Sequence, residues 1–435
     1  GQLLTETNPL GHVTTHEYDA AGNLMISTDP LGNVATFTYD TQGNMTSQTD
    51  PLGNTTGYSY DTYGNLTMTI SPGIDTTRYA YDIMGNKTME TNAKGDTSKF
   101  IYDAMNRMTG SVNPLGDTIH YEYDLLGNQQ AVIDPLGRRT ENVYNLRGEL
   151  VKTIYPDSSI IENLYDANGN RIAFVNQNKD TTKSIYDDAG RLIKTIFTDE
   201  SFTETEYDAA GRTKNTRNQH GGITHYYYDE TGRQTKVIDH YNNTTRYQYD
   251  DAGRRIALID ANANTTTSSY SATGQLIKTT YVDGSSVVYT YDQAGRKITE
   301  RDQAMNTTQF LYDVNGRLIG IIDAKADTTT YEYDKLGNRT AQIDVNGNRT
   351  EFEYDALGRM TKMTFPDTPP LSPPNTPPPF PPPQVGRDKG RGAKNSSFES
   401  YSYNKVGNML WKKDFHSTPY IPPIIANANK RCVII

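Results

Sequence analysis

The sequence contains few cysteine and apolar residues. Cys432 is the one cysteine in 435 residues, so a disulfide within the chain is excluded. Hydrophobic residues make up 34% of the chain, against roughly 45–50% in an average globular domain. No run of about 18 apolar residues occurs, so the sequence predicts no membrane-spanning segment. These shortages favour a thin architecture that buries one face of a sheet over one with a deep core.

Basic residues are also in the minority. The chain has 42 Lys and Arg against 52 Asp and Glu, which gives a net charge of −10. A nucleic-acid-binding surface needs clustered Lys and Arg and a high isoelectric point, so we expect no nucleic-acid partner. Gly1 already lies inside a repeating pattern, and we therefore expect the sequence to be a fragment of a longer chain.

The sequence is rich in one regular feature, a tyrosine that recurs every 21 residues. It occurs seventeen times from Tyr18 to Tyr354 without insertion or deletion. Asp follows it in fifteen units, with Asn145 and Ser271 as the exceptions, and Gly stands four residues after it in sixteen. The exception to the glycine is Asn106, and Asn is the other residue that readily enters the left-handed region. This position is therefore predicted to need a positive φ.

Each unit carries two turn signals. The first, Asp-x-x-Gly as in Asp19–Gly22, places Asp and Gly at the preferred ends of a type I turn. The second, as in Asp29–Gly32 (DPLG), adds Pro at its preferred position. We call them the first and second turns. The predicted structural positions are Tyr18, Asp19, Gly22, Tyr39, Asp40, Gly43, Tyr60, Gly64, Tyr81, Gly85, Tyr102, Asn106, Tyr207, Gly211, Tyr312, Gly316, Tyr354, Gly358, Tyr403 and Gly407.

Two turns per unit leave room for two strands of ordinary length. The strand before each tyrosine alternates, as in Ala35–Tyr39, where Ala, Phe and Tyr share one face and two threonines share the other. The residue two before the tyrosine is Phe or Tyr in eleven of the seventeen units, whereas the residue just before it varies freely. The sequence predicts an all-β fold of tandem 21-residue β-hairpins. These would form a long coiled or spiralling antiparallel sheet, either a hollow shell or a fibre-like ribbon.

These units resemble the YD repeats of RHS proteins. The resemblance rests on copies such as Tyr18-Asp19-Ala20-Ala21-Gly22-Asn23 and runs over about residues 3–367. It implies relatives among bacterial RHS polymorphic toxins, insecticidal toxin-complex shells and teneurin adhesion proteins. It also implies a secreted or cell-surface β-shell, often one that encloses a C-terminal toxin. We expect no toxin domain in the residues that follow the repeats in this sequence.

The repeat is interrupted once, near the C-terminus. Tyr403 lies 49 residues after Tyr354, which is one repeat plus 28 residues. We therefore expect four parts: seventeen in-register repeats in 1–367, a proline-rich low-complexity insertion in 368–395, a degenerate eighteenth repeat in 396–414, and an unassigned tail in 415–435. The insertion could be a plain linker or a polyproline segment that docks on a partner.

A search for chemistry finds no constellation of catalytic residues. The seven histidines occupy no fixed place in the unit, and His12 and His16 would lie about 13 Å apart on a strand, too far for one metal ion. We expect no enzyme activity, no catalytic or metal-binding residues and no cofactor.

The sequence therefore favours a structural scaffold. Two alternatives stay open: an adhesin that presents a carbohydrate-binding surface, and an encapsulating fragment of a polymorphic toxin. The partners implied are the chain itself or other segments of the parent chain, glycans, or an enclosed toxin cargo.

Overall fold

A computed structural model describes residues 1–366 and 398–414 of the chain. The described residues form β-strands joined by short turns, and none of them is helical. In this part of the chain there is accordingly no helix long and apolar enough to cross a membrane. The predicted proline-rich insertion, 368–395, and the predicted C-terminal tail, 415–435, lie outside the described residues.

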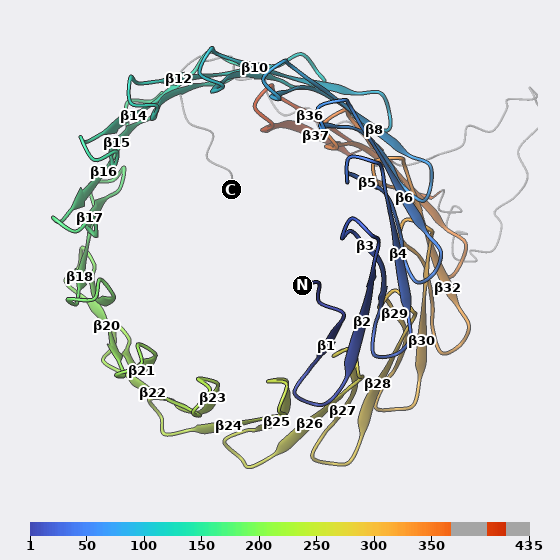
Figure 1. The fold of residues 1–435 in the computed structure, drawn as a ribbon. Helices are drawn as coiled ribbons and strands as arrows, with labels where there is room; N and C mark the ends of the chain where they lie inside the picture. The colour runs from blue at the N-terminus through green and yellow to red at the C-terminus, as the bar shows by residue number, and fades with distance from the viewer. Residues whose placement is uncertain (367–397, 415–435) are drawn as a thin grey trace, which may run out of the picture. The chain divides into compact units, whose positions relative to one another are not determined.

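Strands of six residues that end on the repeat tyrosine alternate with strands that are shorter in every case but β37 (Figure 1). The strands that end on tyrosine are β2 Val13–Tyr18, β4 Val34–Tyr39, β6 Thr55–Tyr60, β8 Thr76–Tyr81, β10 Thr97–Tyr102, β12 Thr118–Tyr123, β14 Arg139–Tyr144, β16 Ile160–Tyr165, β18 Thr181–Tyr186, β20 Phe202–Tyr207, β22 Ile223–Tyr228, β24 Thr244–Tyr249, β26 Thr265–Tyr270, β28 Ser286–Tyr291, β30 Thr307–Tyr312, β32 Thr328–Tyr333, β34 Arg349–Tyr354 and β36 Phe398–Tyr403. The others are β1 Thr5–Thr7, β3 Leu24–Thr28, β5 Met45–Thr49, β7 Leu66–Ile70, β9 Lys87–Thr91, β11 Met108–Val112, β13 Gln129–Ile133, β15 Leu150–Ile154, β17 Arg171–Val175, β19 Leu192–Ile196, β21 Thr213–Arg217, β23 Gln234–Ile238, β25 Arg255–Ile259, β27 Leu276–Thr280, β29 Lys297–Arg301, β31 Leu318–Ile322, β33 Arg339–Ile343, β35 Met360–Thr364 and β37 Met409–Asp414.

The strands pair in antiparallel fashion with their neighbours in sequence, and one hairpin illustrates the register. In β4–β5, Thr38 pairs with Ser47 but Tyr39 pairs with Met45, so Thr46 is the extra residue of a β-bulge. The same shift at the tyrosine recurs in hairpin after hairpin, for example β24–β25 and β34–β35. A bulge of this kind increases the local right-handed twist. The prediction of an all-β fold built from antiparallel hairpin repeats is confirmed.

The chain divides into two compact units. Unit 1 comprises residues 1–330 with 335–337, and unit 2 comprises residues 331–334 with the chain from 338 onward. In unit 2, β36 pairs with β35 and forms a hairpin with β37, with the bulge again at the tyrosine, Tyr403. The eighteenth hairpin thus has the register of the others, although the proline-rich segment precedes it.

The sheet is thin, as the shortage of apolar residues predicts. Among the described residues, the buried apolar side chains are those of three alanines, Ala131, Ala257 and Ala341. Along the strands most side chains on the tyrosine face are half-buried, as in β4, where Ala35, Phe37 and Tyr39 alternate with exposed neighbours. Stability therefore comes from many partly covered contacts and not from one deep core.

The opposite face is more constrained than the variable residue before each tyrosine suggests. Arg139 forms ion pairs with Glu122 and Glu141, each at 2.8 Å. Both glutamates flank Ala131 across the sheet, and Ala131 beneath them is 0% exposed. The same residues recur ten repeats later as Glu332, Arg349, Glu351 and Ala341. The expectation that the residue before the tyrosine is unconstrained is therefore wrong where such a bridge forms.

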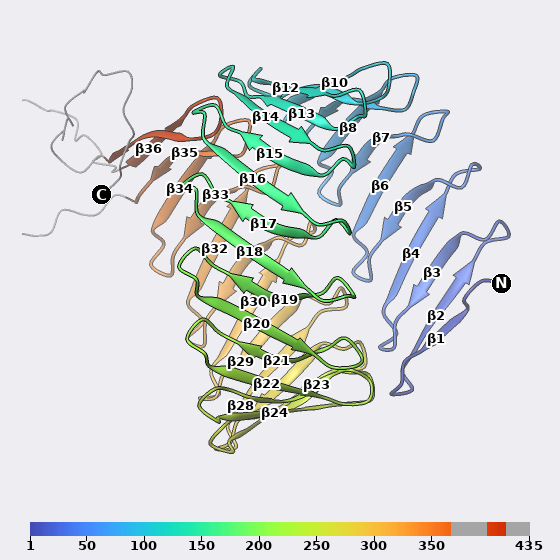
Figure 2. The same cartoon turned by 90° about the vertical axis from the view of Figure 1, so that its left-hand side faces the viewer.

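Within unit 1 the sheet coils until distant turns meet (Figures 1 and 2). The backbone N–H of Gly73, in the second turn between β7 and β8, donates to Oδ1 of Asn315 at 2.8 Å. Asn315 belongs to the first turn between β30 and β31, and its Nδ2 lies 3.5 Å from Oδ2 of Asp75. Gly73 and Asn315 are 242 positions apart, which is about eleven and a half repeats of 21 residues. A first-turn edge of the sheet thus contacts a second-turn edge of an earlier coil.

Candidate functional site

The repeated first turn is the most regular polar site of the molecule. In the turn at Asp19, the N–H of Gly22 donates to the Asp19 carbonyl at 3.1 Å, and the N–H of Asp19 donates to the Asn23 carbonyl at 2.9 Å. Oδ1 of Asp19 accepts the N–H groups of Ala21 and Asn23, both at 2.9 Å. Oδ2 accepts the Asn23 side-chain amide at 2.9 Å. One carboxylate therefore closes the turn with three hydrogen bonds.

These hydrogen bonds favour the ionised carboxylate. The side chain and then the N–H of Asn23 lower the pKa of Asp19 below its ordinary value. At Asp103 the donors are the side chain and the N–H of Arg107, and the pKa of Asp103 is lowered in the same direction. Charge is therefore held at these turns for structural reasons, because both oxygens of the carboxylate accept hydrogen bonds.

The fourth residue of the first turn takes the backbone conformation that the sequence suggests. Gly22 has a φ of 96°, Gly211 of 82° and Gly407 of 87°, and Asn106 takes its place at 61°. The predicted tyrosines all end the six-residue strands, and the predicted Asp and Gly residues lie in the first turns. The structure thus gathers each predicted set within its own repeat. That the fold depends on these positions stays a prediction.

Each repeat tyrosine also ties its hairpin to the preceding one. Fifteen of these hydroxyls donate to a backbone carbonyl at or just before the start of the preceding strand, as Tyr312 does to Lys297 at 2.8 Å. The others are Tyr18, Tyr60, Tyr102, Tyr123, Tyr144, Tyr165, Tyr186, Tyr207, Tyr228, Tyr249, Tyr270, Tyr291, Tyr354 and Tyr403. Tyr403 reaches Met360, 43 residues back instead of 15, which absorbs the 28-residue insertion.

Where the residue after the turn glycine is arginine, a second tie joins neighbouring hairpins. Arg254 donates from Nε to its own turn aspartate, Asp250, at 2.7 Å and from Nη1 to the carbonyl of Ser271 in the next turn at 2.9 Å. Its guanidinium also lies 4.9 Å from the ring centroid of Tyr270, the tyrosine of the next hairpin. Related contacts form at Arg107, Arg212, Arg233, Arg296 and Arg359.

Cations also separate the aromatic rings that stand two residues before the tyrosines. Lys87 Nζ lies 5.5 Å from the ring centroid of Tyr79 and 5.2 Å from that of Phe100. Lys297 lies in the same way between Tyr289 and Phe310. The aromatic rows are therefore interleaved with charge, and these ring faces are engaged within the sheet.

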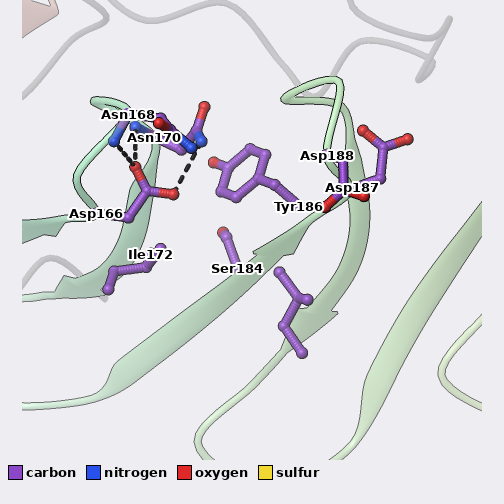
Figure 3. A pocket seen from close by; sticks show the side chains of 9 residues that line it. Asp166, Asn168, Asn170, Ile172, Ser184, Tyr186, Asp187 and Asp188 are labelled. Atoms are coloured by element: carbon purple, nitrogen blue, oxygen red, sulfur yellow. Dashed lines mark hydrogen bonds between the residues drawn. The ribbon is translucent and has the colours of Figure 1, made fainter.

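A shallow depression of about 380 Å³ lies between the first turns of two neighbouring hairpins (Figure 3). Its walls include Asp166 and Asn170 of one turn and Tyr186 and Asp187 of the next. Nδ2 of Asn170 donates to Oδ2 of Asp166 at 2.9 Å, and the asparagine side chain is too short to reach the next hairpin as arginine does. Both aspartates hold their own turns by hydrogen bonds. Asp188 also lines the depression, which marks a step between repeats that no arginine side chain bridges.

One further polar network crosses three strands on the opposite face. Glu206 accepts from Lys214 at 2.6 Å and from Asn215 at 2.5 Å, and Oδ1 of Asn215 lies 2.6 Å from Nδ1 of His225. It links β20, β21 and β22 side by side. Across the described ranges, 1–366 and 398–414, no group of three or more His, Cys, Asp or Glu residues is placed to hold a metal ion.

Family comparisons agree with this repeat geometry. The Teneurin YD-shell family matches residues 119–271 and 170–314. The RHS Repeat family matches residues 1–34, 26–55, 39–73, 312–349 and 333–369. The chain belongs to the RHS/YD-repeat family. No curated protein matches the sequence.

Solved structures share the YD-repeat fold at low sequence identity. "Crystal Structure of TcdB2-TccC3 without hypervariable C-terminal region" matches with a TM-score of 0.64 and 15% identity, covering 94% of this chain and 26% of that one. "Structure of Photorhabdus luminescens Tc holotoxin pore, Mutation TccC3-D651A" matches with a TM-score of 0.63 and 16% identity, covering 93% and 26%. The chain thus spans about a quarter of the length of these structures, and the likeness establishes the fold.

Sequence reasoning recognised the YD tyrosine, aspartate and glycine and the Asn or Arg that follows the glycine, but it gave that last residue no role. Asn or Arg stands there in every unit except those with Glu149 and Gln275, and that restricted choice was the available signal. Asn closes its own turn, whereas Arg also reaches the next hairpin. The contact of Gly73 with Asn315 had no local signal, because it depends on curvature summed over about eleven and a half repeats.

Proposed function

We propose that this chain is a non-enzymatic structural scaffold, a wall segment of a secreted or cell-surface RHS/YD-repeat protein that builds a β-shell or fibre. The observation that carries the proposal is the row of fifteen tyrosine hydroxyls, each bonded to the preceding hairpin. A bond that repeats along most of the sheet propagates one geometry, which a wall requires and a single active site does not.

The hydrogen bonds of the turn carboxylates support the same function. Turn carboxylates could be taken for catalytic acids or metal ligands. Their oxygens instead accept hydrogen bonds from backbone N–H groups and from neighbouring Asn or Arg side chains. A general acid or base needs a free site within reach of substrate. Hydrogen bonds lower the pKa values of first-turn carboxyls such as Asp19 and Asp103, which makes them poor proton acceptors and supports a role in fixing the backbone.

The aromatic rows bear on the adhesin alternative. Sugar rings stack on exposed aromatic faces, but here lysine and arginine side chains lie against several of those faces. This favours a wall over a glycan-binding surface. A wall also suits the second alternative, an encapsulating fragment of a polymorphic toxin whose toxic domain is absent from this chain.

Electron microscopy of the purified chain in negative stain tests the scaffold. We expect a curved wall or ribbon one sheet thick, and a compact solid particle would contradict the proposal. A glycan array at high avidity tests the adhesin, which requires specific binding. Reading the parent gene beyond Ile435 tests the toxin fragment, because an encoded toxin domain would assign this segment to a toxin shell.

A further inference from the structure

Three asparagines of the sequence are followed directly by glycine: Asn168, Asn315 and Asn346. Asparagine is a thermolabile residue, and it loses its side-chain amide most readily before glycine, because glycine has no side chain to shield its backbone nitrogen. Asn168 and Asn346 are exposed, whereas Asn315 is half-buried. All three lie within the described ranges, and among them the side chain of Asn315 is the one that contacts another coil.

Two layers of contacts restrain Asn315. The first is its own turn, in which the N–H of Gly316 donates to the Asp313 carbonyl and the N–H of Asn315 to Oδ1 of Asp313, each at 3.0 Å. The second is the facing turn, where the Gly73 N–H donates to Oδ1 of Asn315 at 2.8 Å and Oδ2 of Asp75 lies 3.5 Å from Nδ2. A Cβ at Gly73 would lie 3.1 Å from Cγ of Asn315, so the carboxamide is packed against this backbone.

Deamidation requires both layers to open. The backbone nitrogen of Gly316 attacks Cγ of Asn315, so that a bond forms between them and the bond from Cγ to Nδ2 breaks. Nδ2 leaves as ammonia with the proton of the Gly316 N–H, and water then opens the succinimide ring at either carbonyl to give aspartate or isoaspartate. The closed turn and the bond from Gly73 keep the nitrogen away from Cγ. Local opening therefore limits the rate.

Either product weakens the contact between coils. Aspartate at position 315 places a second carboxylate beside Oδ2 of Asp75, where Nδ2 of the asparagine lies now, and like charges so close together repel. Isoaspartate adds a methylene group to the main chain just before Gly316. Because Gly316 closes the turn at a φ of 78°, this extra group disturbs the turn that presents the side chain.

We propose that Asn315 is a deamidation site that the contact between coils restrains, and that its conversion opens this contact irreversibly. Each transient separation of the two turns frees the carboxamide, and one completed attack prevents the original contact from forming again. The contact is thereby a slow timer built into unit 1. The inference goes beyond the scaffold function, because it gives the wall a defined point at which it loosens with age.

Ageing of the full chain at physiological temperature and mildly alkaline pH, followed by peptide mapping with mass spectrometry, tests the restraint. Asn168 is the internal control, because it lies exposed in a first turn of the same kind. We expect deamidation at Asn315 to be about 2- to 12-fold slower than at Asn168, the factor that one net hydrogen bond corresponds to. Gly73→Ala displaces the Asn315 side chain and should raise its rate to that of Asn168. In denaturant the two sites should react at similar rates.

The variant Asn315→Asp tests the consequence. We expect amide exchange in the facing turn, residues 71–75, to become about 2- to 12-fold faster. Adding Asp75→Asn should restore slow exchange, because it removes the repulsion. Asn168→Asp is the matched control and should leave exchange at 71–75 unchanged. Circular dichroism checks that each variant folds, and the aged chain gives the same readout without substitution, since its fast-exchanging fraction should grow with the deamidated fraction.

Three results would overturn the inference. The first is deamidation of Asn315 as fast as that of Asn168 in the folded chain, and the second is a Gly73→Ala variant that does not accelerate it. The third is unchanged exchange of residues 71–75 in both Asn315→Asp and the aged chain. Any of these would leave the scaffold function standing, because that function rests on the tyrosine bonds between hairpins.

Discussion

At the scale of the residue, the repeat tyrosine combines three roles. Its ring fills the half-buried face, its backbone ends the strand at the bulge, and its hydroxyl reaches the preceding hairpin. Burial raises the pKa of Tyr60 and Tyr228, which keeps the hydroxyls protonated as donors over a wide pH range. We expect the preference for tyrosine over phenylalanine at this position to follow from the hydroxyl and not from the ring.

Removal of one hydroxyl tests this role. Tyr312→Phe keeps the ring under Arg296 but leaves the Lys297 carbonyl without its side-chain donor. We expect a loss of about 0.5–1.5 kcal/mol in the free energy of unfolding, measured by denaturant titration. Tyr227→Phe is the matched control, because that ring lies on the opposite face and is 42% exposed. Equal losses in the two variants would show that the hydroxyl bond contributes nothing.

At the scale of the element, the hairpin was the most predictable feature. Tyr at 21-residue intervals, Asp at the start of a turn and Gly or Asn106 at positive φ are local signals, because one turn specifies its own backbone. The joints between hairpins were less predictable. Whether a step is bridged by Arg254 or left open by Asn170 depends on where a side chain of the next repeat lies.

Exchanging these two residues tests the joints. Arg254→Asn should keep the turn closed, as Asn170 does, but lose the contacts with Ser271 and Tyr270. We expect faster amide exchange in β26 and β27 and a loss of about 1 kcal/mol in stability. The reverse change, Asn170→Arg, should slow exchange in β18 and β19 by bridging the depression at Tyr186. Unchanged exchange in both variants would contradict the bridging role.

At the scale of the whole molecule, the repeated turn aspartates make stability depend on pH. Hydrogen bonds from Asn23 and Asn128 lower the pKa values of Asp19 and Asp124, and the same direction holds at many other first turns. A carboxyl whose folded pKa lies below its unfolded value of about 3.9 stabilises the fold above that pH, and this stabilisation is lost as the pH falls through the folded pKa.

We therefore expect a steep fall in the melting temperature once the pH drops below about 4, followed by circular dichroism. Hydrogen exchange supplies an internal control, because Asn145 and Ser271 replace the aspartate in two first turns. Those two hairpins should lose less protection on acidification than the hairpin that contains Asp124. Uniform loss along the chain would mean that net charge, and not the turn carboxylates, governs the acid response.

No local sequence pattern predicts the contact between coils of unit 1, in which Gly73 meets Asn315. A double-mutant cycle tests this contact. A Cβ at Gly73 would lie 2.5 Å from Nδ2 of Asn315, so Gly73→Ala must displace that side chain and break the bond from the Gly73 N–H. Gly73 has no positive φ, so alanine adds no backbone strain there. We expect Gly73→Ala to destabilise the chain by about 1–2 kcal/mol in denaturant titrations.

In an Asn315→Ala background the same substitution should cost much less, because the side chain that it displaces is gone. The resulting coupling between the two positions should fall within about 0.5–3 kcal/mol, the range for residues in direct contact. An equal cost in both backgrounds would mean that the two turns do not meet in solution. In that case the curvature built up by the bulged hairpins between β8 and β30 would not bring one coil against the next.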